Sequence, residues 1–138
     1  MVSKLNPIAV HGNDTLMLNT KKTTQDLLQE DLLRERASAL ARAGERLTDA
    51  LERLRSIEKD LTEALVLWYR EVESGGRNSQ RLLSEANVKI RAYNRQREHV
   101  KTRYYYLIVT REALGIIHHE RLEEIYRIPP KKRCLPER

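Results

Sequence analysis

Apolar residues recur at helical spacing through the first half of the chain. One series returns at every seventh residue between Thr24 and Ser74, and a second series lies four residues further on. The first series is Leu33, Leu40, Leu47, Leu54, Leu61 and Trp68, and the second is Ala37, Gly44, Leu51, Glu58, Leu65 and Val72. Residues four apart are neighbours on a helix, so the two series form one apolar seam. They predict a long amphipathic helix over 24–74, with Thr23 or Thr24 as N-cap and Asp26 in the first turn.

A second amphipathic pattern follows two adjacent glycines. Ser74-Gly75-Gly76 interrupts the first seam, and glycine readily adopts the left-handed conformation that ends helices. The second seam consists of Leu83, Ile90, Arg97 and Tyr104, interleaved with Ala86, Tyr93, Val100, Leu107 and Leu114. The pattern predicts a turn over 75–78 and a second helix over 79–114. Because short connections make antiparallel neighbours, we expect a long antiparallel helical hairpin.

The two seams match when the chain is folded back at the glycine pair. The residue that faces position i is then approximately residue 151 minus i. The expected facing pairs are Trp68 with Leu83, Leu65 with Ala86, Leu61 with Ile90, Leu51 with Val100, and Leu47 with Tyr104. Glu58, Asn94 and Arg97 come together in the middle, where they predict a polar layer that fixes the register. The alternative is that these three residues form a polar contact point for a partner.

The ends of the chain predict an arm, a short helix and a tail. Residues 1–22 show no helical period and predict an extended arm, either packed on the helices or held out for a partner. Gly115 ends or interrupts the second helix, 118–126 forms a short third helix, and Pro129-Pro130 stops it. The basic, proline-containing tail is either flexible or extended along a surface. The predicted organisation is an N-terminal arm (1–22), an all-α, coiled-coil-like hairpin domain (23–128) and a C-terminal tail (129–138).

The end of the second helix carries more apolar surface than a two-helix hairpin can bury. The run from Tyr104 to Val109 is apolar on every side of a helix, and such a helix is normally buried all round. A third layer is therefore expected: the arm, the C-terminal segment or another copy of the protein. We predict that the surplus residues contact a partner, the alternative being an intramolecular core. The predicted partner-binding residues are Tyr69, Tyr105, Tyr106, Ile108, Val109, Ile116 and Ile117.

Charge is divided unequally between the two halves of the chain. Residues 1–76 carry 11 Lys and Arg against 13 Asp and Glu, whereas residues 77–138 carry 15 against 7. Opposite signs favour antiparallel packing of the helices, and the positive excess is available to an acidic partner. Basic residues interleaved with tyrosines also bind phosphates and stack on bases, so nucleic-acid binding is the alternative function. The basic face of this alternative is Lys89, Arg91, Arg95, Lys101 and Arg103.

The sequence contains no catalytic, cofactor-binding or metal-binding motif. His118 and His119 point about 100° apart on a helix, and His119 more simply forms an ion pair with Glu123 one turn later. Glycine-rich phosphate loops and nucleophile motifs are missing. Cys134 is the only cysteine, no signal peptide is recognisable, and every apolar run is far shorter than the ~20 residues that span a bilayer. We therefore expect a cytoplasmic protein that is not an enzyme and uses no cofactor.

These patterns together predict a protein-protein interaction module. An adaptor, a chaperone or a stalk-like subunit of a larger assembly would fit a helical hairpin with surplus apolar surface. The expected partner is another protein or a second copy of the chain. A dimer would form a four-helix arrangement that covers the apolar faces which one hairpin leaves exposed.

Overall fold

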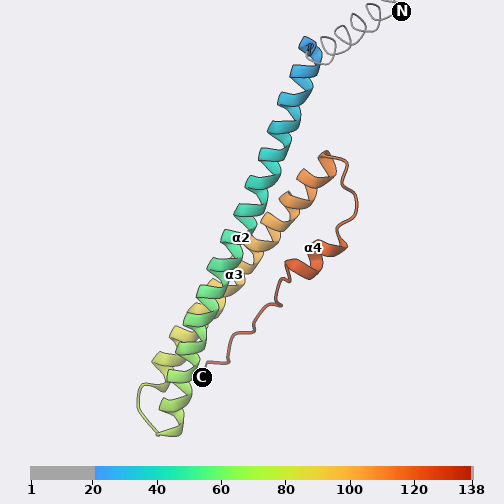
Figure 1. Cartoon of the computed structure of the whole chain (residues 1–138). Coiled ribbons are helices and arrows are strands. Elements are labelled where there is room, and N and C mark those ends of the chain that lie inside the picture. The colour runs from blue at the N-terminus through green and yellow to red at the C-terminus, as the bar shows by residue number, and fades with distance from the viewer. Residues whose placement is uncertain (1–20, 138) are drawn as a thin grey trace, which may run out of the picture. The chain divides into compact units, whose positions relative to one another are not determined.

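The computed structural model describes residues 21–137, and all of their regular elements are helices. Helix α2 spans Thr24–Glu73, α3 spans Ser79–Ala113, and α4 spans Glu120–Ile125 (Figure 1). Two long helices pack against each other and a short third helix follows, which confirms the predicted all-α hairpin. The predicted arm lies outside the described residues, apart from its last two. The described chain divides into two compact units between Ser38 and Ala39.

The first turn of α2 is closed by reciprocal hydrogen bonds between Thr23 and Asp26. The Asp26 amide donates to Thr23 Oγ1 at 3.1 Å, and the Thr23 amide donates to Asp26 Oδ2 at 3.2 Å. This arrangement satisfies amides that a helix leaves unpaired at its start. The bond from the Thr23 backbone amide is the main cause that holds the pKa of Asp26 below its ordinary value. The predicted N-cap is confirmed at Thr23.

Helix α2 ends at the predicted glycine pair. Gly75 has a φ of 68°, and its amide donates to the Val72 carbonyl at 3.2 Å. The Gly76 amide donates to the Glu71 carbonyl at 3.0 Å, which completes a Schellman motif. The Glu71 carboxylate also accepts a hydrogen bond from the backbone amide of Asn78 at 3.1 Å. The end of α2 and the start of α3 are thus fixed by bonds within the turn.

Helix α3 ends in the same way at Gly115. Gly115 has a φ of 84° and donates to the Glu112 carbonyl at 2.9 Å. The Ile116 amide donates to the Arg111 carbonyl at 3.0 Å. This second Schellman motif releases the chain into the connection that leads to α4. The prediction that Gly115 ends the second helix is confirmed.

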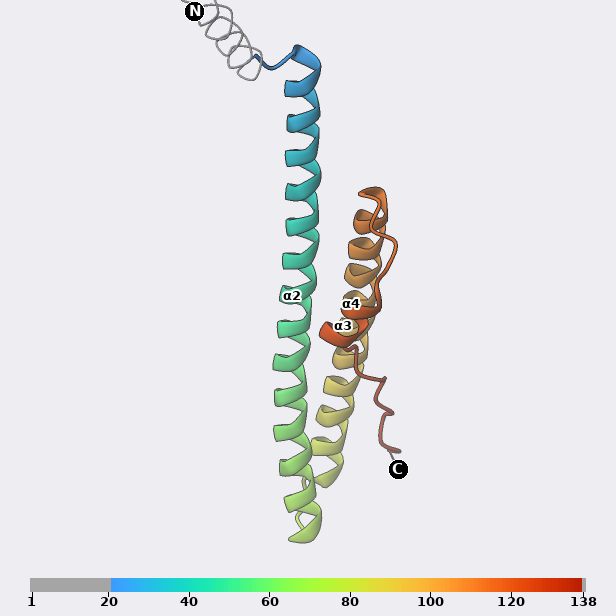
Figure 2. The ribbon, with the colours of Figure 1, turned by 45° about the vertical axis from the view of Figure 1, so that its right-hand side comes forward.

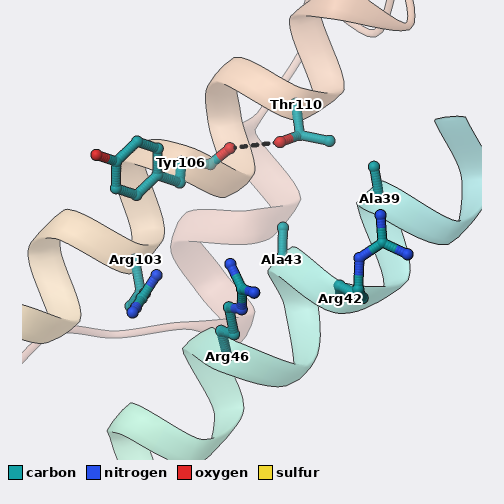
Figure 3. Close-up of a pocket in the computed structure, with 7 residues that line it drawn as sticks. All are labelled: Ala39, Arg42, Ala43, Arg46, Arg103, Tyr106 and Thr110. Atoms are coloured by element: carbon teal, nitrogen blue, oxygen red, sulfur yellow. Dashed lines mark hydrogen bonds between the residues drawn. The ribbon is translucent and has the colours of Figure 1, made fainter.

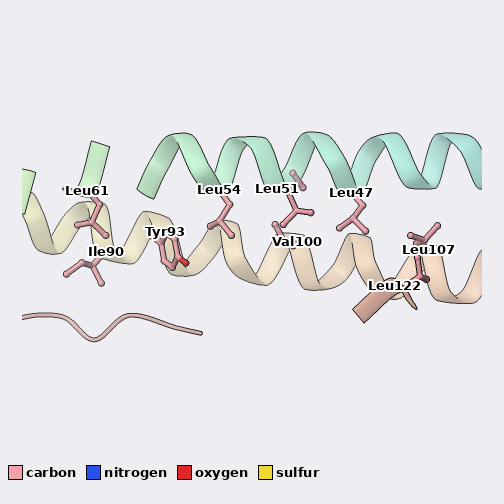
Figure 4. Close-up of a cluster of buried hydrophobic side chains, with 10 residues drawn as sticks. Leu47, Leu51, Leu54, Leu61, Ile90, Tyr93, Val100, Leu107 and Leu122 are labelled. Atoms are coloured by element: carbon pink, nitrogen blue, oxygen red, sulfur yellow. The ribbon is translucent and has the colours of Figure 1, made fainter. Parts of the chain in front are cut away.

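The core of the unit from Ala39 onward lies between α2 and α3, which run side by side (Figure 2). Figure 4 shows Leu61 beside Ile90 and Leu51 beside Val100, as the folding rule predicts. Tyr93 is only 1% exposed, although it is the largest side chain in this row. The other buried apolar residues of the two helices are Leu47, Ala50, Leu54, Leu83, Ala86 and Leu107. A single row of interlocking side chains therefore holds the hairpin together.

The C-terminal segment supplies the third layer. Leu122 of α4 lies beside Leu107, and both are buried (Figure 4). Tyr126, Ile128 and Leu135 pack against the same cluster. The tail, residues 129–137, then runs extended along α3 (Figures 1 and 2). Of the two predicted states of the tail, the extended one is present.

The polar residues in the middle of the seam form contacts with the tail. Asn94 exchanges two hydrogen bonds with the backbone of Lys132, and Arg97 Nε donates to the Pro129 carbonyl at 2.6 Å. The Glu58 carboxylate lies 3.7 Å from the Lys132 ammonium group. Glu58 and Asn94 thus come together at Lys132, and the tail, which the prediction did not include, provides the groups that satisfy these side chains.

Candidate interaction surfaces

Four leucines near the start of α2 form the first candidate surface, called here the leucine strip. Leu27, Leu28, Leu32 and Leu33 are each between 45% and 64% exposed, and no residue from 21 to 38 is buried. Leu28 and Leu32 are one turn apart and share a face. Leu33 points roughly 140° away from Leu28, since successive residues turn by about 100°. The strip therefore presents apolar surface on more than one side of the helix.

A second apolar surface lies on α2 next to the Gly75 turn. Val66, Leu67, Tyr69 and Val72 are each more than 40% exposed. Shallow, mainly apolar depressions lie among these side chains, and their walls include Leu65, Trp68 and Arg70. Trp68, which the heptad pattern assigns to the seam, is only half-buried here. This surface contains Tyr69, one of the predicted partner-binding residues.

The other predicted partner-binding residues lie at or beyond the far end of α3. Tyr105, Tyr106, Val109 and Ile117 are exposed, at 64%, 53%, 42% and 71%. The rings of Tyr105 and Tyr106 are 6.0 Å apart. The remaining two predicted residues, Ile108 and Ile116, are partly covered, and Ile108 packs on the core. The predicted residues thus form two separate surfaces, with Tyr69 apart from the rest.

The fourth candidate surface is a groove between α2 and α3, called here the arginine groove (Figure 3). Its hollow of about 450 Å³ is lined by Ala39, Arg42, Ala43 and Arg46 of α2 and by Arg103, Tyr106 and Thr110 of α3. The adjoining stretch shares Arg46 and Arg103 and adds Asp49, Ala50, Arg53, Gln96 and His99. Alanines leave room between the helices, and the arginines concentrate positive charge there.

The walls of the arginine groove are held by backbone and core contacts. Gln96 Nε2 donates to the Ala50 carbonyl at 3.0 Å, which ties α3 to α2 within the groove. Arg46 and Arg53 directly precede the buried Leu47 and Leu54, so the core fixes their places at the rim. Among residues 21–137, no salt bridge within 4.0 Å engages Arg46, Arg53 or Arg103.

The predicted basic face on the second helix does not gather at this groove. Only Arg103 of the five predicted residues lines it. Lys101 lies 4.0 Å from the Glu98 carboxylate, and Arg91 and Arg95 are simply exposed. Arg42, Arg46 and Arg53 were not predicted from the sequence, because the basic face was sought only in the second half of the chain, which carries the net positive charge. Arg46 and Arg53 directly precede the seam residues Leu47 and Leu54, and this position in the sequence could have indicated that they lie where the two helices meet.

The histidines near α4 form local pairs. His119 Nε2 lies 3.3 Å from Glu112 Oε1, and His119 Nδ1 accepts a hydrogen bond from Arg111 Nε at 3.3 Å. Instead of the predicted ion pair with Glu123, His119 thus contacts Glu112 and Arg111 of α3. Within residues 21–137, no group of three His, Cys, Asp or Glu side chains is placed to hold a metal ion. That same part of the chain contains no helix with the length and apolarity of a membrane span.

Comparisons with protein families, with curated proteins and with solved structures find no match to this chain. The features that point to a function are therefore the four surfaces and the bound tail.

Proposed function

We propose that the protein is a non-catalytic interaction module that binds another protein, or a second copy of itself, through apolar helix surface. The leucine strip is the observation that carries this proposal. Burying one leucine side chain contributes about 1.5–3 kcal/mol, so covering four half-exposed leucines supplies much of the free energy of a stable interface. An adaptor, chaperone or stalk-like subunit in the cytoplasm fits such a module.

A second copy is the first partner to test. Leucines on two sides of one helix suit a bundle in which several helices surround α2, and two hairpins supply four long helices. The proposed dimer also gives a role to the exposed Tyr105 and Tyr106. A dimer assembled in this way has a concentration-dependent mass.

The leucine strip can be tested with the double variant Leu28→Ser, Leu32→Ser. Light scattering on a sizing column, over about two decades of concentration, should show the wild-type chain rising above its monomer mass of 16.2 kDa. The double variant should stay near the monomer mass, because it removes the apolar side chains but leaves the rest of the hairpin intact. Tyr105→Ser, Tyr106→Ser tests the exposed tyrosines at the far end of α3 by the same measurement.

The matched control is Gln25→Ser, Gln29→Ser, which changes two exposed residues one turn apart on the same segment. This variant should associate like the wild-type chain. A wild-type chain that remains at 16.2 kDa throughout would contradict self-association. Capture experiments with immobilised wild-type and leucine-variant chains would then ask whether a different protein binds the strip.

Binding of a polyanion at the arginine groove is the second candidate function. The observation that favours it is the convergence of Arg46, Arg53 and Arg103 on one groove that also presents Tyr106. Guanidinium groups bind phosphates in a bidentate manner, and a tyrosine ring offers a surface for stacking. This placement replaces the basic face that the sequence predicts.

The groove can be tested with a fluorescent single-stranded oligonucleotide at two salt concentrations. Binding should weaken with salt. Arg46→Gln, Arg103→Gln should reduce the magnitude of the slope of log K against log salt by about 1.4, which corresponds to the loss of about 2 phosphate contacts to a single strand. Arg91→Gln, Arg95→Gln removes the same charge outside the groove and should have a much smaller effect. Equal losses in both variants would refute a specific role for the groove.

A further inference from the structure

The tail is held on α3 mainly through its backbone. Asn87 Nδ2 donates to the Leu135 carbonyl at 2.8 Å, and the Leu135 amide donates to Asn87 Oδ1 at 2.7 Å. Asn94 repeats this pair of bonds with Lys132, at 2.8 Å and 2.9 Å. Each carboxamide thus pairs with both backbone groups of one residue, as a neighbouring β-strand would.

The spacing of the two asparagines matches an extended peptide. Asn87 and Asn94 are seven residues apart, which is about 10.5 Å along a helix. Lys132 and Leu135 are three residues apart, which is about 10 Å in an extended chain. Arg97 continues the row by donating to the Pro129 carbonyl at 2.6 Å. Because these bonds involve only backbone groups of the tail, they depend little on its side chains.

The edge of α3 that holds the tail consists of polar side chains that are largely shielded from solvent. Asn87 is 2% exposed, and Asn94 and Arg97 are half-buried. A buried carboxamide needs a partner for both its donor and its acceptor, and the extended backbone supplies the two together. Without a peptide on this edge, these polar groups would lose the partners that the structure gives them.

Side chains of the tail are contacted in addition to its backbone. Glu137 Oε1 accepts hydrogen bonds from Asn87 Nδ2 at 2.9 Å and from Ser84 Oγ at 3.4 Å, and the Lys131 ammonium group lies 3.5 Å from Glu98 Oε1. The Lys132 ammonium group lies 4.9 Å from the centre of the Tyr93 ring and 3.7 Å from Glu58 Oε1. Leu135 packs against the core cluster. An ammonium group over an aromatic face and beside a carboxylate is favourable. The edge therefore selects an extended peptide with the pattern Lys-x-x-Leu.

The tail occupies this edge with little buried surface of its own. No residue from 126 to 137 is buried, and Pro130, Arg133 and Cys134 are exposed. Its attachment thus depends on hydrogen bonds, on the ion pairs of Lys131 and Lys132, and on the partly covered Leu135. A segment held in this way exchanges with a competitor more readily than one locked into the core.

We propose that Asn87, Asn94 and Arg97, with Tyr93 and Glu58, form a binding site for an extended Lys-x-x-Leu peptide of a partner protein. The chain's own tail fills this tail site in cis, and the partner's segment displaces it. The chemistry that the partner must supply is a free extended backbone with a lysine and, three residues later, a leucine. The tail site is independent of the leucine strip and of the arginine groove.

The test uses the full chain with an environment-sensitive fluorophore on Cys134, which is exposed and is the only cysteine. The competitor is a synthetic peptide of residues 128–137 that carries Cys134→Ser. The attached tail has an effective concentration of the order of millimolar, so displacement from the wild-type chain requires peptide in that range. In a labelled chain with Leu135→Ala, binding of the attached tail is weakened, while the residues of the tail site are unchanged. Half-displacement there should need about tenfold less peptide.

Two controls separate the tail site from non-specific effects. A peptide with Leu135→Pro lacks the amide that donates to Asn87 and should displace far more weakly. The chain variant Asn87→Leu, Asn94→Leu should keep its helical circular dichroism. Its label should show the fluorescence of a displaced tail before any peptide is added, and this fluorescence should not respond to peptide. The proposal is overturned if the label gives the same fluorescence in the wild-type chain and in the variant that lacks both asparagines. It is also overturned if millimolar peptide fails to displace the tail from the Leu135→Ala chain.

Discussion

Few side chains of residues 21–137 are fully buried, and those on the two long helices form a single row. Leu47, Leu54 and Leu61 of α2 are at most 2% exposed, and Val100 of α3 is completely covered. In a core only one side chain thick, a truncated residue has few neighbours that can move in to replace it. Each residue of the row is therefore expected to contribute strongly to stability.

Leu54→Ala should destabilise the hairpin by about 3 kcal/mol, because few neighbouring side chains can move in to fill the cavity that it leaves. Urea unfolding followed by circular dichroism measures the change. Leu67→Ala is the matched control, since Leu67 lies on the same helix and is 54% exposed. If the two variants lost equal stability, burial in the seam would not be the source of the effect.

The hydrogen bonds between Thr23 and Asp26 give the start of α2 a dependence on pH. The pKa of Asp26 is lowered, chiefly by the Thr23 backbone amide and next by the Thr23 hydroxyl. The ionised form therefore stabilises the helix start above the unfolded pKa, and this contribution is lost as the pH falls through the lower folded pKa. Thr23→Ala should raise the pKa of Asp26 toward its ordinary value. NMR titration of the carboxyl group in both chains tests this, and identical titration would exclude the role of the hydroxyl.

At the scale of whole elements, three glycines act in two different ways. Gly75 and Gly115 have positive φ values and complete the Schellman motifs that end α2 and α3. Gly44 lies inside α2, and a methyl group added there would meet no atom within 4 Å. Glycine is needed at the two helix ends, whereas inside α2 it only weakens the helix.

Substituting alanine should therefore have opposite effects at Gly44 and Gly75. Gly44→Ala should stabilise the hairpin by about 0.5–1 kcal/mol, because alanine is the better helix former. Gly75→Ala should destabilise it by about 1 kcal/mol, since an L-residue is strained at a φ of 68°. Chemical denaturation of the two variants beside the wild-type chain measures both changes. A shift in the same direction for both would contradict this assignment.

At the scale of the whole molecule, the sequence predicts the hairpin better than its surfaces. The central parts of the seams, the turn at Gly75 and the end of α3 at Gly115 follow from residues close together in sequence and are confirmed. Leu33 and Val72, at the two ends of the first seam, are exposed. The tail site joins Asn87 to Leu135 across 48 positions, and no local pattern encodes that contact. The arginine groove likewise arises only when α2 and α3 come together.

Alkaline pH should destabilise the folded chain through Tyr93. Burial is the main cause that raises the pKa of Tyr93, and the Glu58 carboxylate adds to it. The neutral phenol therefore stabilises the fold below the unfolded pKa of about 10, and this contribution is lost as the pH rises through the folded pKa. Thermal unfolding at about pH 8 and about pH 11 should show a smaller loss of Tm for Tyr93→Phe than for the wild-type chain. Tyr69→Phe, at an exposed site, is the control, and equal losses in all three chains would assign the effect elsewhere.

The position of the turn also sets the order in which the seam is closed during protein synthesis. The ribosome releases α2 before α3, so Leu47, Leu54 and Leu61 emerge with no helix to cover them. Pairing starts beside Gly75, where facing residues are separated by the shortest loops, and proceeds toward Leu47. The nascent chain thus carries an open hydrophobic row until most of α3 has been made, and the tail, which follows α3 in the chain, can dock only after that.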